Sequence, residues 1–133
     1  MKLTRATDYA LRILTHLASG GEGATSEELA QKLDVPFNHA AKLVQVLARK
    51  GYLVTRKGKG GGLRLSVDPK KIDLSAVIEA IEGPLIISDC LFHRDYCRFS
   101  PKCKVRKALA RVRARMNEVL SSTTIYDLKE VRA

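Results

Sequence analysis

The sequence has 133 residues, 45% of them hydrophobic, and it carries a formal charge of +10 with an isoelectric point near 9.8. A chain of this length forms one ordinary domain with an appended element, and it is too short for an enzyme with separate cofactor and substrate domains. Residues 1–14 lack the uninterrupted apolar stretch of a signal peptide, and no window approaches the roughly 20 apolar residues that span a bilayer. We therefore expect a cytoplasmic protein whose partner is a polyanion, either nucleic acid or a membrane surface.

Three helices are predicted before residue 51, over residues 3–19, 27–33 and about 36–50, from apolar side chains at helical spacing. Thr25 or Ser26 followed by Glu28 resembles a capping signal for the second helix. Pro36 fits the opening turn of the third helix because its missing N–H is not needed there, and Gly51 occupies the usual position just after a helix end. The third helix is expected to bury Ala40, Leu43, Val44 and Leu47.

The next segment has the character of a β-hairpin. Two strands are predicted at residues 52–55 and 63–67, and glycines and cations fill residues 56–62 between them. Three helices followed by a basic hairpin are the plan of a winged helix-turn-helix domain, whose third helix enters the major groove of DNA. A flexible loop is the alternative interpretation of the glycines, but cations cluster about this hairpin as a DNA-binding domain would present them. A Walker-type phosphate loop is disfavoured because the Gly-Lys-Ser/Thr ending is absent.

Two further helices are predicted after the hairpin. One follows Asp68-Pro69 and stops at Gly83-Pro84, and a long one extends from about residue 101 to residue 121. The apolar stripe of the long helix is longer than one small winged domain can cover, so we expect two chains to pack through it as a homodimer. The alternative is that the stripe folds back onto its own domain, and the cations of this helix are interpreted as a solvated face. The stripe comprises Val105, Ala108, Leu109, Val112, Met116, Val119 and Leu120.

These elements together predict a mainly α fold with a small β-hairpin wing at about residues 53–67. Residues 1–83 are expected to form the winged helix-turn-helix DNA-binding domain. Residues 84–133 are expected to form a cysteine loop and a dimerisation helix. No membrane partner is predicted.

Cys90, Cys97 and Cys103 lie within fourteen residues and are the only cysteines of the chain. Three thiols cannot all pair internally, and thiols stay reduced in a cytosol, so metal binding or redox chemistry is favoured over a disulfide framework. Thiolates are soft ligands that suit iron-sulfur clusters, zinc or copper(I), and something from outside the segment must supply the fourth bond. His93 would complete an irregular Cys3His zinc site, but an exposed loop position or an outer role beside the site is the simpler interpretation.

DNA contacts are assigned by the geometry of a winged domain. Asn38 can pair bidentately with adenine, although it can also serve as a local cap, and His39 can donate to guanine or phosphate. Lys57 and Lys59 at the wing are expected to contact phosphate or the minor groove, which adds affinity more than specificity. The full set of expected DNA-binding residues is Phe37, Asn38, His39, Lys42, Lys57 and Lys59.

Residues 35–84, followed by the spaced cysteines and the C-terminal helix, resemble the winged-helix iron-sulfur transcription repressors, a superfamily that contains NsrR and IscR. The Asn38-His39 pair, Lys42, the three glycines at residues 60–62 and Asp8 are similar to the pattern of the nitric-oxide-sensing NsrR group. The resemblance implies a homodimeric repressor with a [4Fe-4S] cluster held by the three cysteines and by Asp8 of the partner subunit. It also implies that modification of the cluster by nitric oxide releases an operator in double-stranded DNA.

Some features of the chain depart from this pattern or have plainer readings. Asp8 in the first turns of a helix would also interact favourably with the helix dipole. IscR-like relatives carry a histidine after the third cysteine, and here residues 105–107 contain none. Lys57 replaces an arginine common at the wing of relatives, and Lys59 adds a cation that should strengthen salt-dependent binding.

Two other functions stay open on the sequence alone. The first is a regulator of the same superfamily that senses iron or redox status. The second is a DNA-binding protein with structural zinc or no metal, which responds to thiol oxidation or to a protein partner. An enzyme is not expected, because no nucleophile–His–acid grouping or pair of carboxylates is placed for catalysis.

Overall fold

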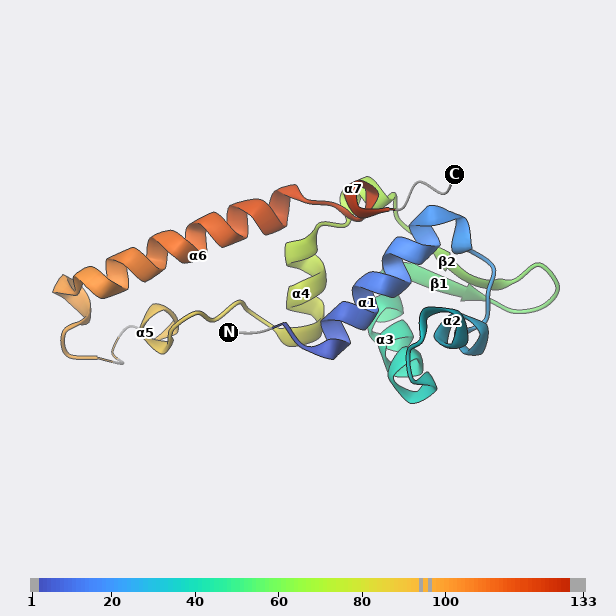
Figure 1. Ribbon diagram of the computed structural model, residues 1–133, viewed down its shortest axis with the longest axis horizontal. Coiled ribbons are helices and arrows are strands. Elements are labelled where there is room, and N and C mark those ends of the chain that lie inside the picture. Colours follow the sequence, from blue (N-terminus) through green and yellow to red (C-terminus); the bar gives the residue numbers. More distant parts are fainter. Residues whose placement is uncertain (1–2, 94, 96, 130–133) are drawn as a thin grey trace.

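The structure, a computed structural model, describes residues 3–93, 95 and 97–129, and it is elongated, with the hairpin at one end and the start of the longest helix at the other (Figure 1). Its α-helices are α1 Arg5–His16, α2 Ser26–Leu33, α3 Phe37–Arg49, α4 Leu74–Glu82, α5 Asp89–Phe92, α6 Lys104–Ser122 and α7 Ile125–Leu128. The strands β1 Leu53–Arg56 and β2 Gly62–Leu65 form one antiparallel sheet, and short helical turns occupy Leu17–Gly21, Pro69–Lys71 and Ser100–Lys102. The predicted mainly α fold with a hairpin wing is confirmed.

Helix α1 is the centre of the hydrophobic core. Its apolar residues recur three and four positions apart, so they form one face, and the buried members are Ala10, Ile13 and Leu14, continued by Leu17 in the turn that follows. This face packs against α3 and α4, and each fully buried Leu or Ile stabilises the fold by roughly 1.5–3 kcal/mol. The predicted start at residue 3 is wrong, because α1 begins at Arg5 and Leu3 is exposed.

Helices α2 and α3 form the predicted helix-turn-helix pair. The hydroxyl of Thr25 accepts a hydrogen bond from the backbone N–H of Glu28 at 3.2 Å, which confirms the predicted cap of α2. Pro36 directly precedes α3, and Asp34 ends α2 in the left-handed conformation at a φ of 54°. The side chains predicted to be buried in α3 are all buried: Ala40, Leu43, Val44 and Leu47.

The wing is anchored at its base and projects at its tip. Leu53 pairs with Leu65 in the hairpin register, and both Leu53 and Leu63 are buried in the core. The connection between α1 and α2 pairs with β2 through its backbone. Gly23 N donates to Leu63 O at 2.9 Å, and Leu63 N donates to Ala24 O at 2.8 Å. This pairing was not predicted, because it joins segments about forty residues apart in the sequence.

The C-terminal segment returns to the first helices through α7. Ile125 is fully buried against the core, and its N–H donates to Ile72 O at 2.8 Å. Thr124 and Asp127 form a capping box at the start of α7, and the hydrogen bonds from Thr124 lower the pKa of the Asp127 carboxyl. Neither α7 nor α5 was predicted, because each has only four residues and therefore shows no helical period.

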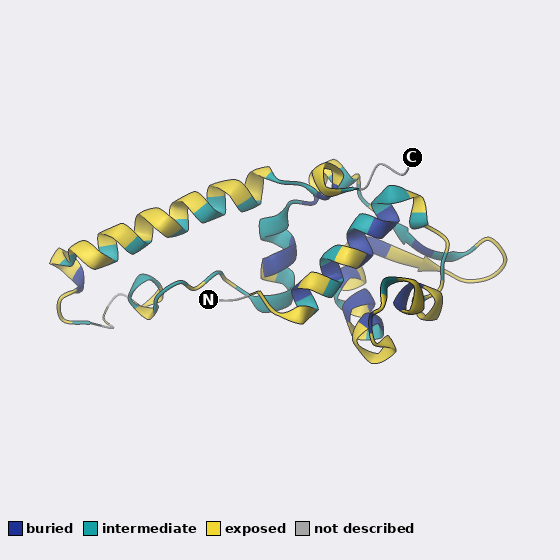
Figure 2. Cartoon of the chain, viewed as in Figure 1, coloured by how far each residue is buried: buried dark blue, intermediate teal, exposed yellow. Residues whose placement is uncertain are grey.

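Helix α6 stands apart from the core along most of its length, as its exposed surface in Figure 2 shows. It contacts α4, and none of its residues is buried within this chain. No helix among residues 3–93, 95 and 97–129 is both long and apolar enough to cross a membrane.

The close approach of the wing to residue 23 can be tested with two glycines that share a left-handed conformation. A Cβ on Gly62, at a φ of 107°, would overlap the backbone of Gly23, whereas a Cβ on Gly58, at a φ of 90°, would meet no atom within 4 Å. Gly58→Ala should therefore cost only the backbone strain of roughly 1–2 kcal/mol. Gly62→Ala should cost at least about 1 kcal/mol more, measured by urea unfolding. Equal losses of stability would show that the wing does not pack on the α1–α2 connection.

Candidate nucleic-acid interface and metal centre

One face of α3 is polar and exposed. Asn38, Lys42, Gln45 and Arg49 are all exposed, and their spacing of four, three and four residues places them in one row along the helix. The row can present two amides and two cations to the edges of bases and to phosphates. The expected DNA-binding residues did not include Gln45, and they counted Arg49 only among the cations near the hairpin, although the same spacing that marks the buried face of α3 would have placed both in this row.

The first turn of α3 also carries two exposed rings. The Phe37 ring is exposed and lines a hollow between the start of α2 and the wing. The His39 ring meets the Tyr9 ring of α1 edge-on, with centroids 5.8 Å apart. His39 is therefore exposed for contact with a partner and is also held against α1.

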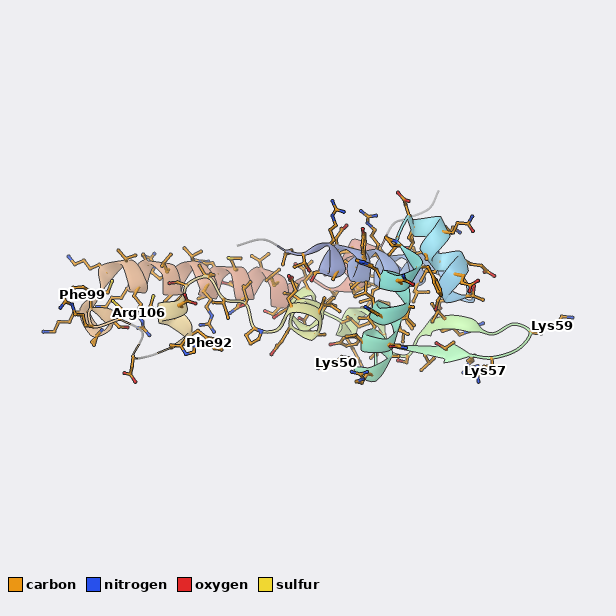
Figure 3. The ribbon with its side chains drawn as sticks, turned by 90° about the horizontal axis from the view of Figure 1, so that it is seen from below. Lys50, Lys57, Lys59, Phe92, Phe99 and Arg106 are labelled. Carbon is orange, nitrogen blue, oxygen red and sulfur yellow. The ribbon has the colours of Figure 1, made fainter. Side chains whose placement is uncertain are left out.

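The wing tip presents cations away from the rest of the molecule. Lys57 and Lys59 are exposed, and Figure 3 shows them at the end of the molecule that is remote from Phe99 and Arg106. The Arg64 guanidinium donates from Nη2 to Gly60 O at 3.1 Å and so braces the glycine-rich tip. The structure thus brings the predicted wing residues together as one exposed cationic projection.

Asp8 lies in the first turn of α1, with 56% of its side chain exposed. Its carboxylate forms an ion pair with Arg12 at 2.8 Å, one helical turn further on. Arg12 in turn donates from Nη1 to Leu33 O at 3.3 Å, at the last residue of α2. The half-exposed Asp8 carboxylate is therefore connected to the end of α2 through the side chain of Arg12.

Glu82, the last residue of α4, holds the start of α1. Its Oε1 accepts a hydrogen bond from Thr4 N at 3.1 Å, and its Oε2 accepts one from the Thr7 hydroxyl at 2.8 Å. A carboxylate at this position also interacts favourably with the positive end of the α1 dipole. The helix that carries Asp8 is thereby fixed to the point where the chain leaves α4 for the cysteine segment.

The three cysteines are free thiols, each half-buried, on three different local structures. Cys90 lies in α5, where its Sγ is 3.1 Å from the hydroxyl of Ser88, and Cys97 lies in the loop. Cys103 is the residue that caps α6, and its Sγ accepts a hydrogen bond from Arg106 N at 3.4 Å. The Arg106 side chain donates from Nε to Cys90 O at 3.1 Å, so the residue contacts one end of the segment through its backbone and the other through its side chain.

The three cysteine thiols are soft donors of the kind that an iron-sulfur cluster or a zinc ion takes as thiolates. Among the described residues, no three His, Cys, Asp or Glu side chains converge closely enough to hold one ion. A cluster binds each thiolate through a different iron atom, so it accepts ligands that are farther apart. His93 is exposed and packs edge-on against the Phe92 ring, with centroids 4.8 Å apart, in agreement with the predicted exposed loop position.

The arrangement of α1 and α5 bears on the predicted fourth ligand. Figures 1 and 3 show the two helices separated along the long axis of the molecule, with the linker from α4 between them. Asp8 and the cysteine segment of one chain are therefore not brought together. A carboxylate from a second chain is compatible with this separation.

The outer face of α6 is apolar at intervals of seven residues. The exposed fractions are 66% for Val105, 48% for Val112 and 62% for Val119. A seven-residue repeat keeps side chains on one side of a helix, as in helices that pack in pairs. This face is not covered by the described part of the chain.

Comparisons with known proteins match this chain to transcriptional regulators over nearly its whole length. Residues 3–130 match the Rrf2 family, described as iron-dependent transcriptional regulators. The sequence is 34% identical over 131 residues to the HTH-type transcriptional regulator NsrR of Bacillus subtilis (strain 168), covering 96% of this chain and 90% of that protein. It is also 34% identical over 136 residues to the regulator of the same name from Geobacillus kaustophilus (strain HTA426), covering 100% and 92%.

Solved structures give the same picture of the fold. The structure of CymR (YrzC), the global cysteine regulator of B. subtilis, matches with a TM-score of 0.77 at 27% identity, covering 96% of this chain and 95% of that one. T. potens IscR matches with a TM-score of 0.75 at 21% identity, covering 96% and 85%. At that lower identity the likeness concerns the fold alone.

Proposed function

Because the chain belongs to the Rrf2 family of transcriptional regulators, we propose that it is a homodimeric DNA-binding repressor that senses nitric oxide through an iron-sulfur cluster. Family membership confirms the prediction of a transcription regulator that is not an enzyme. The sensing role is carried by one observation: three free, half-buried cysteines in a chain 34% identical to regulators named NsrR. A cytoplasmic location follows from this role.

DNA recognition is assigned to α3 and the wing. Asn38, Lys42 and Gln45 face the major groove, where an amide can bind adenine through two hydrogen bonds. Phe37 and His39 contact the DNA at the first turn of α3. Lys57 and Lys59 bind phosphate or the minor groove. The exposed row on α3 and the cationic tip support these roles.

Cys90, Cys97, Cys103 and Asp8 of the partner subunit are the proposed cluster ligands. Bound there, a [4Fe-4S] cluster supplies an iron that an oxygen ligand leaves more exchangeable than thiolates would, and therefore open to a diatomic molecule. The exposure of Asp8 and its separation from α5 within one chain support a ligand from the partner. When Asp8 serves as a ligand, its ion pair with Arg12 weakens, and Arg12 is the residue that binds the end of α2.

A second candidate is a regulator with structural zinc or no metal that responds to thiol oxidation or a protein partner. The observation that favours it is that the three cysteines are free, half-buried thiols, which an oxidant can reach without any metal. Anaerobic purification separates the two candidates. A brown protein that contains iron and sulfide supports the cluster, whereas a colourless protein with stoichiometric zinc supports the alternative. A cluster that responds to iron or redox status instead of nitric oxide is distinguished by titrating nitric oxide anaerobically while following both cluster absorbance and operator binding.

The cluster ligands can be tested by reconstitution. Cys90→Ala, Cys97→Ala and Cys103→Ala should each abolish stable cluster assembly, because each removes a thiolate that the rest of the chain cannot replace. Asp8→Ala should still assemble a cluster, but a more labile one, because solvent or added thiol takes the open position. His93→Ala is the matched control and should leave the iron and sulfide content unchanged. Full iron content in any cysteine variant contradicts the assignment.

The dimer face can be tested by placing a charge on it. Val112→Lys would bury an uncompensated ammonium at a cost of several kcal/mol, so the variant should become monomeric or unstable. Ala114→Lys is the matched control, because Ala114 is exposed and lies about 200° around the helix from Val112. Sedimentation equilibrium measures the dissociation constant. An unchanged dimer in Val112→Lys would place the interface elsewhere.

Two variants should distinguish recognition of the base sequence from electrostatic attraction to DNA. Asn38→Ala should lose roughly 1–3 kcal/mol of discrimination at one base pair while most nonspecific affinity remains, because no charge is removed. Lys59→Ala should weaken binding to every duplex and lower the slope of log K against log salt by about one unit. Binding assays with mutated operators over a range of salt concentrations provide both measurements. If Asn38→Ala weakened binding to all duplexes equally, Asn38 would not read a base. If Lys59→Ala left the salt slope unchanged, Lys59 would not contact a phosphate.

A further inference from the structure

Arg106 connects the two ends of the cysteine segment. It is half-buried in the first turn of α6, its backbone N–H donates to Cys103 Sγ, and its Nε donates to Cys90 O across sixteen positions of sequence. In the described part of residues 84–103, every other hydrogen bond joins residues no more than four positions apart. The Arg106 side chain therefore provides the long-range polar contact that holds the turn containing Cys90 against the start of α6.

We propose that Arg106 is a positioning residue for cluster acquisition: it holds Cys90 close to Cys103 in the protein before any cluster is bound. This inference rests on the proposed function, because it assigns a role in filling the same site. Closing a segment of this length costs conformational entropy, and a side chain that closes it in advance removes that cost from the assembly step. The cysteines would then meet the incoming iron and sulfide as a partly formed set of ligands.

The chemistry of arginine fits this position better than that of lysine. The Nε–H lies partway along the side chain, so it can bind the Cys90 carbonyl while the two terminal NH2 groups remain available. The guanidinium also places a positive charge beside ligands that a cluster binds as thiolates. Lysine would retain the charge but would lose the donor at the Nε position.

The position of Arg106 allows its role to be separated from DNA binding. Figure 3 shows Arg106 near Phe99 at the end of the molecule opposite to Lys57 and Lys59. A substitution there leaves the row on α3 and the wing cations in place. A change in cluster acquisition can therefore be measured without an accompanying loss of the DNA-binding surface.

The first experiment measures positioning in the cluster-free protein. In a Cys97→Ser background only Cys90 and Cys103 remain, and dibromobimane, which fluoresces when it bridges two thiols, reports how often they meet. Arg106→Lys and Arg106→Gln should each slow bridging about three- to tenfold, the range expected for the loss of one hydrogen bond. Arg111→Lys is the matched control, because Arg111 is an exposed cation of the same helix, and it should bridge at the parent rate. Labelling by monobromobimane, which reacts with one thiol at a time, measures the thiol reactivity of each variant, and the bridging rate is divided by it before variants are compared.

The second experiment follows cluster assembly from iron and sulfide with all three cysteines present. Arg106→Lys should slow the rise of the cluster absorbance by a similar factor and reach the same final iron content, while Arg111→Lys matches the parent protein. Unchanged bridging in Arg106→Lys, or slower bridging with normal assembly kinetics, overturns the positioning role. If Arg106→Gln fails to fold by circular dichroism, the charge-conserving Lys variant decides alone. A parent protein that takes up no iron or sulfide overturns both the proposed sensing function and the role in acquisition, whereas normal parent uptake with unchanged bridging overturns the positioning role alone.

Discussion

The buried face of α1 is the constraint on which the other elements depend. Ala10, Ile13, Leu14 and Leu17 form one continuous apolar surface, and α2, α3, α4 and α7 all pack against this helix. Because protein interiors are close-packed, a shift of α1 must be followed by the elements around it. The same helix exposes Asp8 on its outer side and presents the Tyr9 ring to His39 of α3. The helix at the centre of the core thus also carries Asp8, the proposed ligand to the cluster of a second chain.

Two charged side chains extend this constraint from the first part of α1 to neighbouring segments. Glu82 fixes the beginning of α1 to the end of α4, from which the cysteine segment leaves, and Arg12 joins Asp8 to the last carbonyl of α2. Neither contact lies deep in the core, so each contributes modestly to global stability. Their importance is geometric, because they connect the start of α1 to the linker on one side and to the helix-turn-helix pair of α2 and α3 on the other.

The sequence predicted those features that depend on local patterns, and it missed those that depend on distant pairing. The buried face of α3, the Thr25 cap and the hairpin follow from periodicity and turn chemistry and were confirmed. The burial of Ile125 was missed because α7 is one turn long, although Thr124 and Asp127 at capping-box spacing were a usable signal. The contact of Arg106 with Cys90 has no signal in one sequence, since nothing local distinguishes Arg106 from the other cations of α6. The division into two units at residues 83 and 84 and the residues that contact metal and DNA stay predictions.

A metal ligand supplied by a second chain would couple cluster binding to dimerisation. The chain exposes both halves of such an arrangement, a carboxylate on α1 and an apolar heptad face on α6, at sites that its own described residues do not bring together. Linkage is reciprocal, so a cluster that is bound more tightly by the dimer must stabilise the dimer by the same free energy. Loss of the cluster would then weaken the interface and release Asp8 to Arg12 in both subunits at once. Two α3 helices that bind DNA as a pair would be sensitive to such a change, because the interface would set their separation.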